Sequence, residues 1–396
     1  MLRDQRVSLC ARSVIRGALC ALLSLAQSAC QETDISEEST PGFQIQKPEG
    51  FPALPIPEEN PPSEAKIELG RYLFYDTLLS ENQTYSCGTC HQQALAFTDG
   101  LPVAEGSTGE QHTLGSMSLV NVAYAATLGW GNPTLRSLES QALVPLFGEE
   151  PIELGLSRLS EEALMERLRD ETRYQELFPA AFPEDEAPFT VANLVKALAT
   201  FQRTIISADS PYDRDQRGEE GAMSEAAARG MDLFFSERLE CFHCHGGFNF
   251  SDAVSSPDFP FDEQPFHNNG MYNVGGSGAY PANHGVYELT ESPKDQGKFK
   301  APTLRNIAVT GPYLHDGSVE SLDALIDLYA AGGRKIIEGE NSGDGTQHPN
   351  KSTFIAGFEL SEEEKADLIA FLEALTDETL LNDPALSDPY TESEDP

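Results

Sequence analysis

Basic residues are scarce in this sequence, and cysteine is scarce beyond its first thirty positions. Only 26 of the 396 residues are Lys or Arg, against 64 Asp or Glu, which gives a formal net charge of −38. This balance argues against a nucleic-acid partner, because binding to phosphates needs a basic surface. With 39% hydrophobic residues the chain should still bury a core, and its length suits two domains of ordinary size.

Long apolar runs are also missing, and the one near the N-terminus is too short to span a bilayer. Residues 1–29 carry four arginines, then this short apolar run and small residues, which is the pattern of a signal peptide. Cys30 follows and fits a lipoprotein site; ordinary cleavage that leaves Cys30 unmodified is the alternative. We therefore expect export to the periplasm, with an outer-membrane lipid anchor if Cys30 is acylated. Residues 30–62, acidic and proline-rich, should form a tether and an extended lead-in.

The cysteines after Cys30 form two C-x-x-C pairs, and a histidine follows each pair. The motifs are Cys87-Gly88-Thr89-Cys90-His91 and Cys241-Phe242-His243-Cys244-His245. This spacing is typical of covalent c-type haem attachment, in which two thiols bond the haem vinyl groups and the adjacent histidine ligates the iron. A redox-active cysteine pair or a split zinc site are the alternatives, but neither accounts for both histidines.

The surroundings of the two motifs repeat, which predicts two copies of one domain type. A serine-capped segment with the pattern G-x-x-L-F precedes each motif, at Gly70–Phe74 and at Gly230–Phe234. Other readable segments are helical and strand alternation is rare, so we expect an all-α fold of two cytochrome-c-like domains with their haems facing the interface. The expected domains are 63–207 and 208–382, followed by a loose acidic tail, 383–396.

From these residues the chain resembles the bacterial di-haem cytochrome c peroxidase family, and within it the MauG and MbnH type of enzyme. The segments that carry the resemblance are Leu69–Asp76, Phe97–Gly100, Ser116–Tyr124, Gln141–Gly155, Ser210–Asp213, Phe266–Gly270, Ala301–Asn306 and Pro312–Gly317. The resemblance implies that peroxide reacts at the N-terminal haem. It also implies that the C-terminal haem is six-coordinate and passes electrons.

The resemblance places the distal iron ligand of the C-terminal haem at Tyr329, where ordinary peroxidases of the family carry methionine. A thioether raises the reduction potential of a haem, whereas an anionic phenolate should stabilise high-valent iron. Periodicity alone would make Tyr329 a packed aromatic on the apolar face of its helix.

The resemblance also assigns Gln141, Pro145 and Glu153 to the distal pocket of the peroxide-binding haem. A carboxylate there can move a proton between the two peroxide oxygens. Compared with the usual spacing in the family, this chain has two extra residues between Gln141 and Glu153, so Glu149 or Glu150 is the alternative base. A further alternative is that these acids are solvent-exposed loop residues without a catalytic role.

Trp130, the only tryptophan, falls where relatives hold an aromatic relay between the haems; the alternative is an aromatic in a turn. Relatives also hold a calcium ion between the haems. Thr310 and Pro312 match two of its ligands, and the third falls near Gly115.

Three functions follow. The first is an H2O2-dependent oxidase that stores oxidising equivalents on both haems and oxidises a residue of a partner protein, expected to be tryptophan. In MbnH-type relatives this partner is copper-associated. The second is a peroxidase that takes electrons from a small cytochrome or copper protein. The third is a non-enzymatic electron carrier, in which His112 would have to ligate the first iron.

Overall fold

The computed structural model describes residues 43–259 and 265–391. The predicted signal peptide (1–29), Cys30 and the first part of the tether lie outside these ranges. The described regular structure is mostly helical, as predicted, and none of these helices has the length and apolar character that a membrane span needs. One small sheet was not expected: within the described ranges, β1 (Lys335–Ile336) pairs antiparallel with β2 (Gly343–Asp344).

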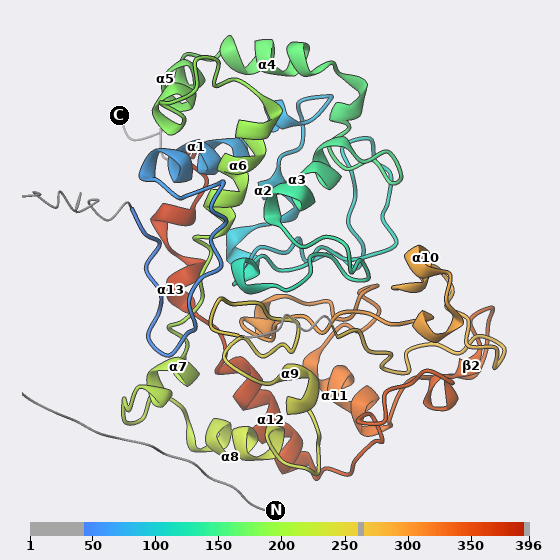
Figure 1. The fold of residues 1–396 in the computed structure, drawn as a ribbon. Helices are drawn as coiled ribbons and strands as arrows, with labels where there is room; N and C mark the ends of the chain where they lie inside the picture. Colours follow the sequence, from blue (N-terminus) through green and yellow to red (C-terminus); the bar gives the residue numbers. More distant parts are fainter. Residues whose placement is uncertain (1–42, 260–264, 392–396) are drawn as a thin grey trace, which may run out of the picture. The chain divides into compact units, whose positions relative to one another are not determined.

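Most helices are short and are joined by long loops (Figure 1). The α-helices are α1 (Glu64–Tyr75), α2 (Cys87–Cys90), α3 (Leu138–Phe147), α4 (Glu161–Arg169), α5 (Thr172–Ala181), α6 (Val191–Gln202), α7 (Pro211–Gln216), α8 (Glu225–Phe234), α9 (Phe242–His245), α10 (Tyr287–Thr290), α11 (Leu322–Ala330), α12 (Glu362–Glu373) and α13 (Glu378–Leu381). The 3-10 turns are η1 (Thr77–Leu79), η2 (Gln93–Leu95), η3 (Val122–Tyr124), η4 (Leu156–Arg158), η5 (Pro293–Asp295), η6 (Ile307–Val309), η7 (Gly345–Gln347) and η8 (Pro384–Leu386).

The sequence repeat corresponds to a repeated helix pair, α1 with α6 and α8 with α12. The repeated glycine sits where the two helices of each pair touch. A Cβ added at Gly70 would lie 2.1 Å from the Ala197 carbonyl oxygen, and one at Gly230 would lie 1.9 Å from the Asp367 carbonyl oxygen. Only glycine permits this approach, because any side chain would push the helices apart.

Each helix pair is held by aromatic side chains that occupy equivalent positions in the repeat. Phe74 packs against Phe201 with ring centroids 5.2 Å apart, and Phe234 packs against Phe371 at the same 5.2 Å. The side chains around the first pair form one hydrophobic cluster with α3 to α5, and those around the second form another with α11. The described residues fall in one compact unit, so the division into domains at 207/208 stays a prediction.

A buried polar network lies at that predicted boundary. The Asn121 side chain bonds the main chain of Ser207 through both its oxygen (2.9 Å) and its nitrogen (3.1 Å). Asn306, the equivalent residue of the second repeat, donates to the Ser207 hydroxyl at 3.0 Å and accepts the Asp377 amide at 2.7 Å. Because unpaired groups would be costly in such a buried place, the network joins the two repeats rigidly.

The C-terminal residues are not loose over the part that the structure describes, contrary to our prediction for 383–396. Leu386 is buried in the first hydrophobic cluster, and its carbonyl accepts a 2.6 Å hydrogen bond from the Tyr75 hydroxyl. The Tyr390 hydroxyl donates to the Asp76 carboxylate at 2.7 Å. Residues 383–391 therefore return to α1, and Figure 1 shows α13 beside the helices of the first repeat rather than of the second.

The lead-in is likewise packed where it is described. Phe51 is 6% exposed, and its ring lies 6.0 Å from that of Tyr124 and 4.9 Å from that of Phe248. The tether prediction for residues 30–62 is therefore wrong for the segment around Phe51, which extends across both repeats without a helix. Aromatic burial was not expected there because proline and acid dominate the composition.

Candidate active site

Both predicted proximal histidines are oriented by the same contact. His91 follows α2 and its Nδ1 lies 2.8 Å from the Phe97 carbonyl oxygen; His245 ends α9 and its Nδ1 lies 3.1 Å from the Phe250 carbonyl oxygen. Phe97 and Phe250 both adopt a positive φ, of 60° and 48°, which turns these carbonyls toward the imidazoles. With Nδ1 engaged, Nε2 is the nitrogen left to ligate iron.

Burial lowers the pKa of both His91 and His245. An imidazole must be neutral to ligate a metal, so this shift suits the role. The four cysteines of the motifs form no disulfide and are partly buried. Each pair lies on or beside a single helical turn, so both thiols can reach one edge of a porphyrin.

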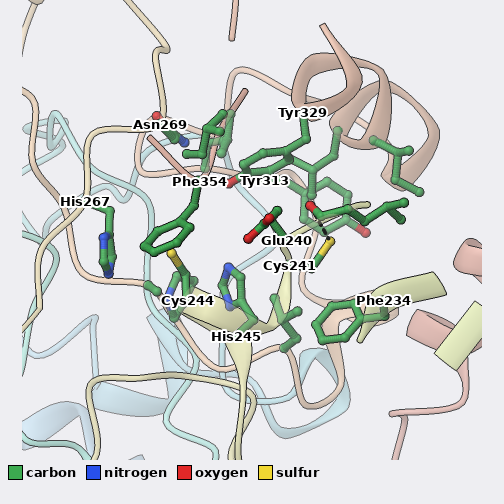
Figure 2. A pocket seen from close by; sticks show the side chains of 18 of the residues that line it. Phe234, Glu240, Cys241, Cys244, His245, His267, Asn269, Tyr313, Tyr329 and Phe354 are labelled. Atoms are coloured by element: carbon green, nitrogen blue, oxygen red, sulfur yellow. Dashed lines mark hydrogen bonds between the residues drawn. The ribbon is translucent and has the colours of Figure 1, made fainter. Parts of the chain in front are cut away.

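A cavity of about 390 Å³ lies beside the second motif (Figure 2). Cys241, Cys244 and His245 line one side of it, and Tyr329 lines it from α11. Much of the remaining wall is apolar and comes from loops, while α8, α11 and α12 contribute Phe234, Leu325, Ile326, Leu368 and Leu372. An apolar cavity with two thiols and one oriented imidazole fits a covalently attached haem.

Tyr329 faces His245 across this cavity (Figure 2). Burial raises the pKa of the Tyr329 phenol to about 12, and a hydrogen bond with the Asn269 side chain opposes part of that shift. The side chain therefore lies in the wall of the haem cavity, where a distal ligand would be, and is held by a polar neighbour. Its ligand role stays a prediction.

Trp130 comes from the first half of the sequence but lines the cavity of the second motif. Its indole N–H donates to the Gly115 carbonyl at 2.8 Å, and its own carbonyl accepts the Lys300 amide at 2.8 Å. This placement agrees with a relay between the two sites, which stays a prediction.

The calcium prediction is not tested. Gly115 donates to the His315 carbonyl at 2.8 Å, which brings Gly115 to the segment that carries Thr310 and Pro312. As a calcium ligand, Gly115 could offer only its main-chain carbonyl oxygen. That oxygen already accepts a hydrogen bond from the indole N–H of Trp130.

The loop after α3 brings one of the three candidate acids toward the first motif. The Leu154 amide donates to the Pro145 carbonyl at 2.9 Å, so the loop folds back onto the end of α3. Burial raises the pKa of Glu153 to about 7, and its charge in turn raises the pKa of the Cys87 and Cys90 thiols. The carboxylate therefore lies on the side where the first haem would be attached.

The other two acids are placed differently, since Glu149 and Glu150 are exposed. Gln141 and Pro145 lie one helical turn apart and share a face of α3. The geometry thus favours Glu153 over its two neighbours, and the assignment of the three distal residues stays a prediction.

Sequence reasoning missed two further contacts of histidines that line the haem cavity. The His267 Nε2 lies 2.6 Å from an Asp252 carboxylate oxygen; burial lowers the pKa of His267, but the bonds to Asp252 and Cys244 outweigh it and raise the pKa to about 10. His315 stacks on Phe299 at 3.8 Å, and burial lowers its pKa to about 4. The residues of each pair lie in irregular segments 15 or 16 positions apart, so no helical or strand periodicity predicts the contacts.

The family model described as "Di-haem cytochrome c peroxidase" matches residues 64–221. The cytochrome-c peroxidase IdrP1 of Denitromonas iodatirespirans is 35% identical over 358 residues, which cover 86% of this chain and 89% of the relative. The chain belongs to the di-haem cytochrome c peroxidase family. The methylamine utilization protein MauG of Methylorubrum extorquens is 32% identical over 364 residues, covering 91% of this chain and 92% of that protein.

A solved structure from the same family has the same fold. The crystal structure of a MauG-like protein associated with microbial copper homeostasis superimposes with a TM-score of 0.86 and 46% sequence identity, covering 88% of this chain and all of the other. Family membership identifies the protein as a peroxidase-type oxidoreductase and implies two c-type haems. Their attachment at the two C-x-x-C-H motifs stays a prediction, which the family favours over a redox-active cysteine pair or a zinc site.

Proposed function

We propose that this di-haem protein is a MauG-type oxidase that uses hydrogen peroxide to oxidise a residue of a partner protein, with tryptophan as the expected target. The observation that carries the proposal is Tyr329, which faces His245 across the second haem cavity (Figure 2). Methionine in that place would suit a peroxidase that hands on electrons quickly. A tyrosine oxygen suits a site that keeps oxidising equivalents until a slow protein partner reacts.

The haems supply the iron that binds peroxide and that accepts its two oxidising equivalents. The chain supplies the proton chemistry. With haem bound, the Glu153 carboxylate would accept a proton from one peroxide oxygen and return it to the other, which would leave as water with the electron pair of the O–O bond. Two electrons and two protons from the partner residue would balance the second peroxide oxygen as another water.

Electrons from the partner enter through the second site in this proposal, and Trp130 relays them to the first. Trp130 lines the second cavity while its indole bonds the Gly115 loop that comes from the first half. The copper association of the MauG-like relative supports a partner that is itself copper-associated. Calcium bound by Thr310 and Pro312 completes the proposal, and metal analysis of the purified holoprotein tests it.

A plain peroxidase that takes electrons from a small cytochrome or copper protein is the second candidate. Relatives of this kind are as similar as the MauG proteins, since IdrP1 is 35% identical. The two functions differ in what happens to the oxidising equivalents after peroxide has been consumed.

Tyr329→Met is expected to shorten the lifetime of the oxidised holoprotein by about tenfold or more, because an anionic oxygen donor is replaced by a neutral thioether. The measurement adds one equivalent of peroxide to the diferric protein and follows optical and EPR spectra without any electron donor. Wild type should show one high-spin and one low-spin haem and a long-lived oxidised state. Tyr313→Phe, in the same cavity wall, is the matched control and should leave that lifetime unchanged.

Two results would contradict the proposal. Rapid turnover of wild type with reduced cytochrome c, without any stored oxidation, would leave a plain peroxidase. Two low-spin haems that do not react with peroxide would leave an electron carrier.

Export to the periplasm, with Cys30 as a lipid-anchor site, is proposed from the sequence pattern alone. Intact-mass measurement of the protein purified from membranes and from the periplasm distinguishes the outcomes. An acylated Cys30 gives a membrane-bound species heavier by its acyl chains, and cleavage without acylation gives an unmodified soluble one. A mature chain that still contains residues 1–29 would overturn the export proposal.

A further inference from the structure

His112 is a buried histidine whose ring nitrogen has no hydrogen-bond partner among the described residues. Its side chain is 17% exposed, and the Nε2 atom is buried without a partner. The nearest carboxylate oxygen is Oε1 of Glu153, at 3.6 Å. A buried polar atom left unpaired costs free energy, so a histidine would not be kept in this place for packing alone.

Main-chain hydrogen bonds fix the conformation of the loop that carries His112. The Ala104 amide donates to the Leu114 carbonyl at 3.1 Å, and the His112 amide donates back to the Ala104 carbonyl at 2.8 Å. These bonds close the loop into a hairpin-like turn. His112 therefore has a defined main-chain position, which a disordered surface histidine would not have.

Hydrogen bonds attach the loop that carries His112 to the loop that carries Glu153. The Ser107 amide donates to the Glu153 carbonyl at 2.7 Å, and the Ile152 amide donates to the Glu110 carboxylate at 3.2 Å. The contact is so close at Gly106 that an added Cβ would lie 1.8 Å from the Ile152 carbonyl oxygen. Three points of attachment thus fix the His112 loop against the Glu153 loop, and the two side chains meet as a consequence.

We propose that His112 is the positioning residue for Glu153: in the haem-loaded protein its Nε2–H would donate to the Glu153 carboxylate and hold that side chain in place beside the first motif. This inference rests on the acid–base role given to Glu153 under the proposed function. A movement of less than about 1 Å converts the 3.6 Å contact into a hydrogen bond of ordinary length. His112 need not touch peroxide or iron for this role.

The charges around the pair are consistent with a neutral donor and an ionisable acceptor. Burial lowers the pKa of His112, and the nearby Glu110 carboxylate opposes that shift only in part. A neutral imidazole carries one N–H and can donate it to a carboxylate. Glu153 is also close enough to Cys87 and Cys90 to act on them electrostatically. A donor to the ionised form of a carboxyl lowers its pKa, so His112 keeps Glu153 ready as a base.

The test compares His112→Phe, which keeps a flat ring without a donor, with His112→Gln, which restores an N–H. The rate of the holoprotein with peroxide is measured against pH. In His112→Phe the half-maximal rate should move to higher pH by about one unit, so that at low pH the rate falls by about tenfold. His112→Gln should recover most of the shift. His284→Gln, a histidine that bonds Gln296, is the matched control and should change nothing.

A second readout does not depend on turnover. The optical spectrum of the resting first haem is titrated with pH in wild type, His112→Phe and Glu153→Gln. A transition that shifts upward in His112→Phe and disappears in Glu153→Gln supports the pairing. Circular dichroism confirms that each variant is folded.

Two outcomes would overturn the inference. If the pH midpoint of His112→Phe equals that of wild type while peroxide still reacts, the proposed function stands and the positioning role of His112 is wrong. If wild type has a low-spin first haem that becomes high-spin in His112→Phe, then His112 ligates the iron instead.

Discussion

Glu153→Gln is expected to slow the reaction of the holoprotein with peroxide by a factor of about 10²–10⁴, the usual contribution of a positioned general acid–base group. Glutamine keeps the size of the side chain but can neither take nor return the proton. Stopped-flow measurement at the first haem checks the rate. Glu149→Gln and Glu150→Gln are matched controls on the same loop, and both are exposed, so their rates should equal that of wild type.

The pH profile adds a second check on the same residue. Because burial raises the pKa of Glu153 to about 7, the carboxylate that acts as a base forms as pH rises through about 7. The wild-type rate should therefore rise over that range and level off above it, whereas the glutamine variant should show no such step. A large loss of rate in Glu149→Gln or Glu150→Gln, with Glu153→Gln unaffected, would move the role to that neighbour.

Asp213→Asn is expected to destabilise the holoprotein by about 3–5 kcal/mol, because it removes one partner of a buried ion pair and strands the other. Arg305 is 1% exposed and Asp213 is 8% exposed, and two hydrogen bonds of 2.8 and 2.9 Å join them. Asp213 also completes the capping box of α7, because its carboxylate accepts the Ser210 amide at 3.0 Å. Urea denaturation, followed by circular dichroism, measures the loss.

Two controls distinguish the cost of stranding a buried charge from the cost of losing an ion pair as such. Arg158→Met breaks a pair whose side chains are 50% and 32% exposed, and should cost no more than about 1 kcal/mol. The double variant Asp213→Leu with Arg305→Met should lose less than Asp213→Asn, since no charge is left unpaired. Equal losses in the single and double variants would show that the ion pair is not what stabilises this region.

The same pair predicts how stability depends on pH. The Arg305 hydrogen bonds and charge outweigh burial and hold the pKa of Asp213 below its usual value of 3.8. A carboxyl whose pKa is lowered by folding stabilises the folded state above its unfolded pKa, and this stabilisation is lost as pH falls through the lowered value. Wild type should therefore lose more stability than Asp213→Asn when the pH is lowered below about 4.

The sequence predicted the parts of the site that follow from local spacing. The two C-x-x-C-H motifs and the repeated glycine at Gly70 and Gly230 can be found because each lies at a fixed distance in a recognisable pattern. The assignment of Tyr329 came instead from the resemblance to the family, since periodicity alone indicates a packed aromatic. The structure adds the reason for the glycines, which is the contact with Ala197 and Asp367.

The sequence could not predict contacts made between loops. His112 and Glu153 come from different loops and meet only because Ser107 and Glu110 bond the main chain of the second loop. No periodicity marks such a pair. The choice of Glu153 over Glu149 and Glu150 also depended on its position near His112 and the first motif, which three acids within one short loop do not reveal.

The prediction that the acidic C-terminal segment is loose was wrong for a related reason. Composition suggested solvent exposure, but Tyr390 and Leu386 attach the segment to α1 through a few specific contacts. Average polarity describes how a segment behaves alone, whereas a docked segment is stabilised by the surface that receives it.

The return of the C-terminus to α1 also affects how the chain can be made. Tyr390 reaches a carboxylate 314 residues earlier in the sequence. During synthesis the first haem-binding half would normally fold before the second emerges from the ribosome. Here its hydrophobic cluster lacks Leu380 and Leu386 until the last residues have been added. The first half therefore cannot complete its hydrophobic cluster on its own, and the segment around Leu386 completes it only after the second half has been made.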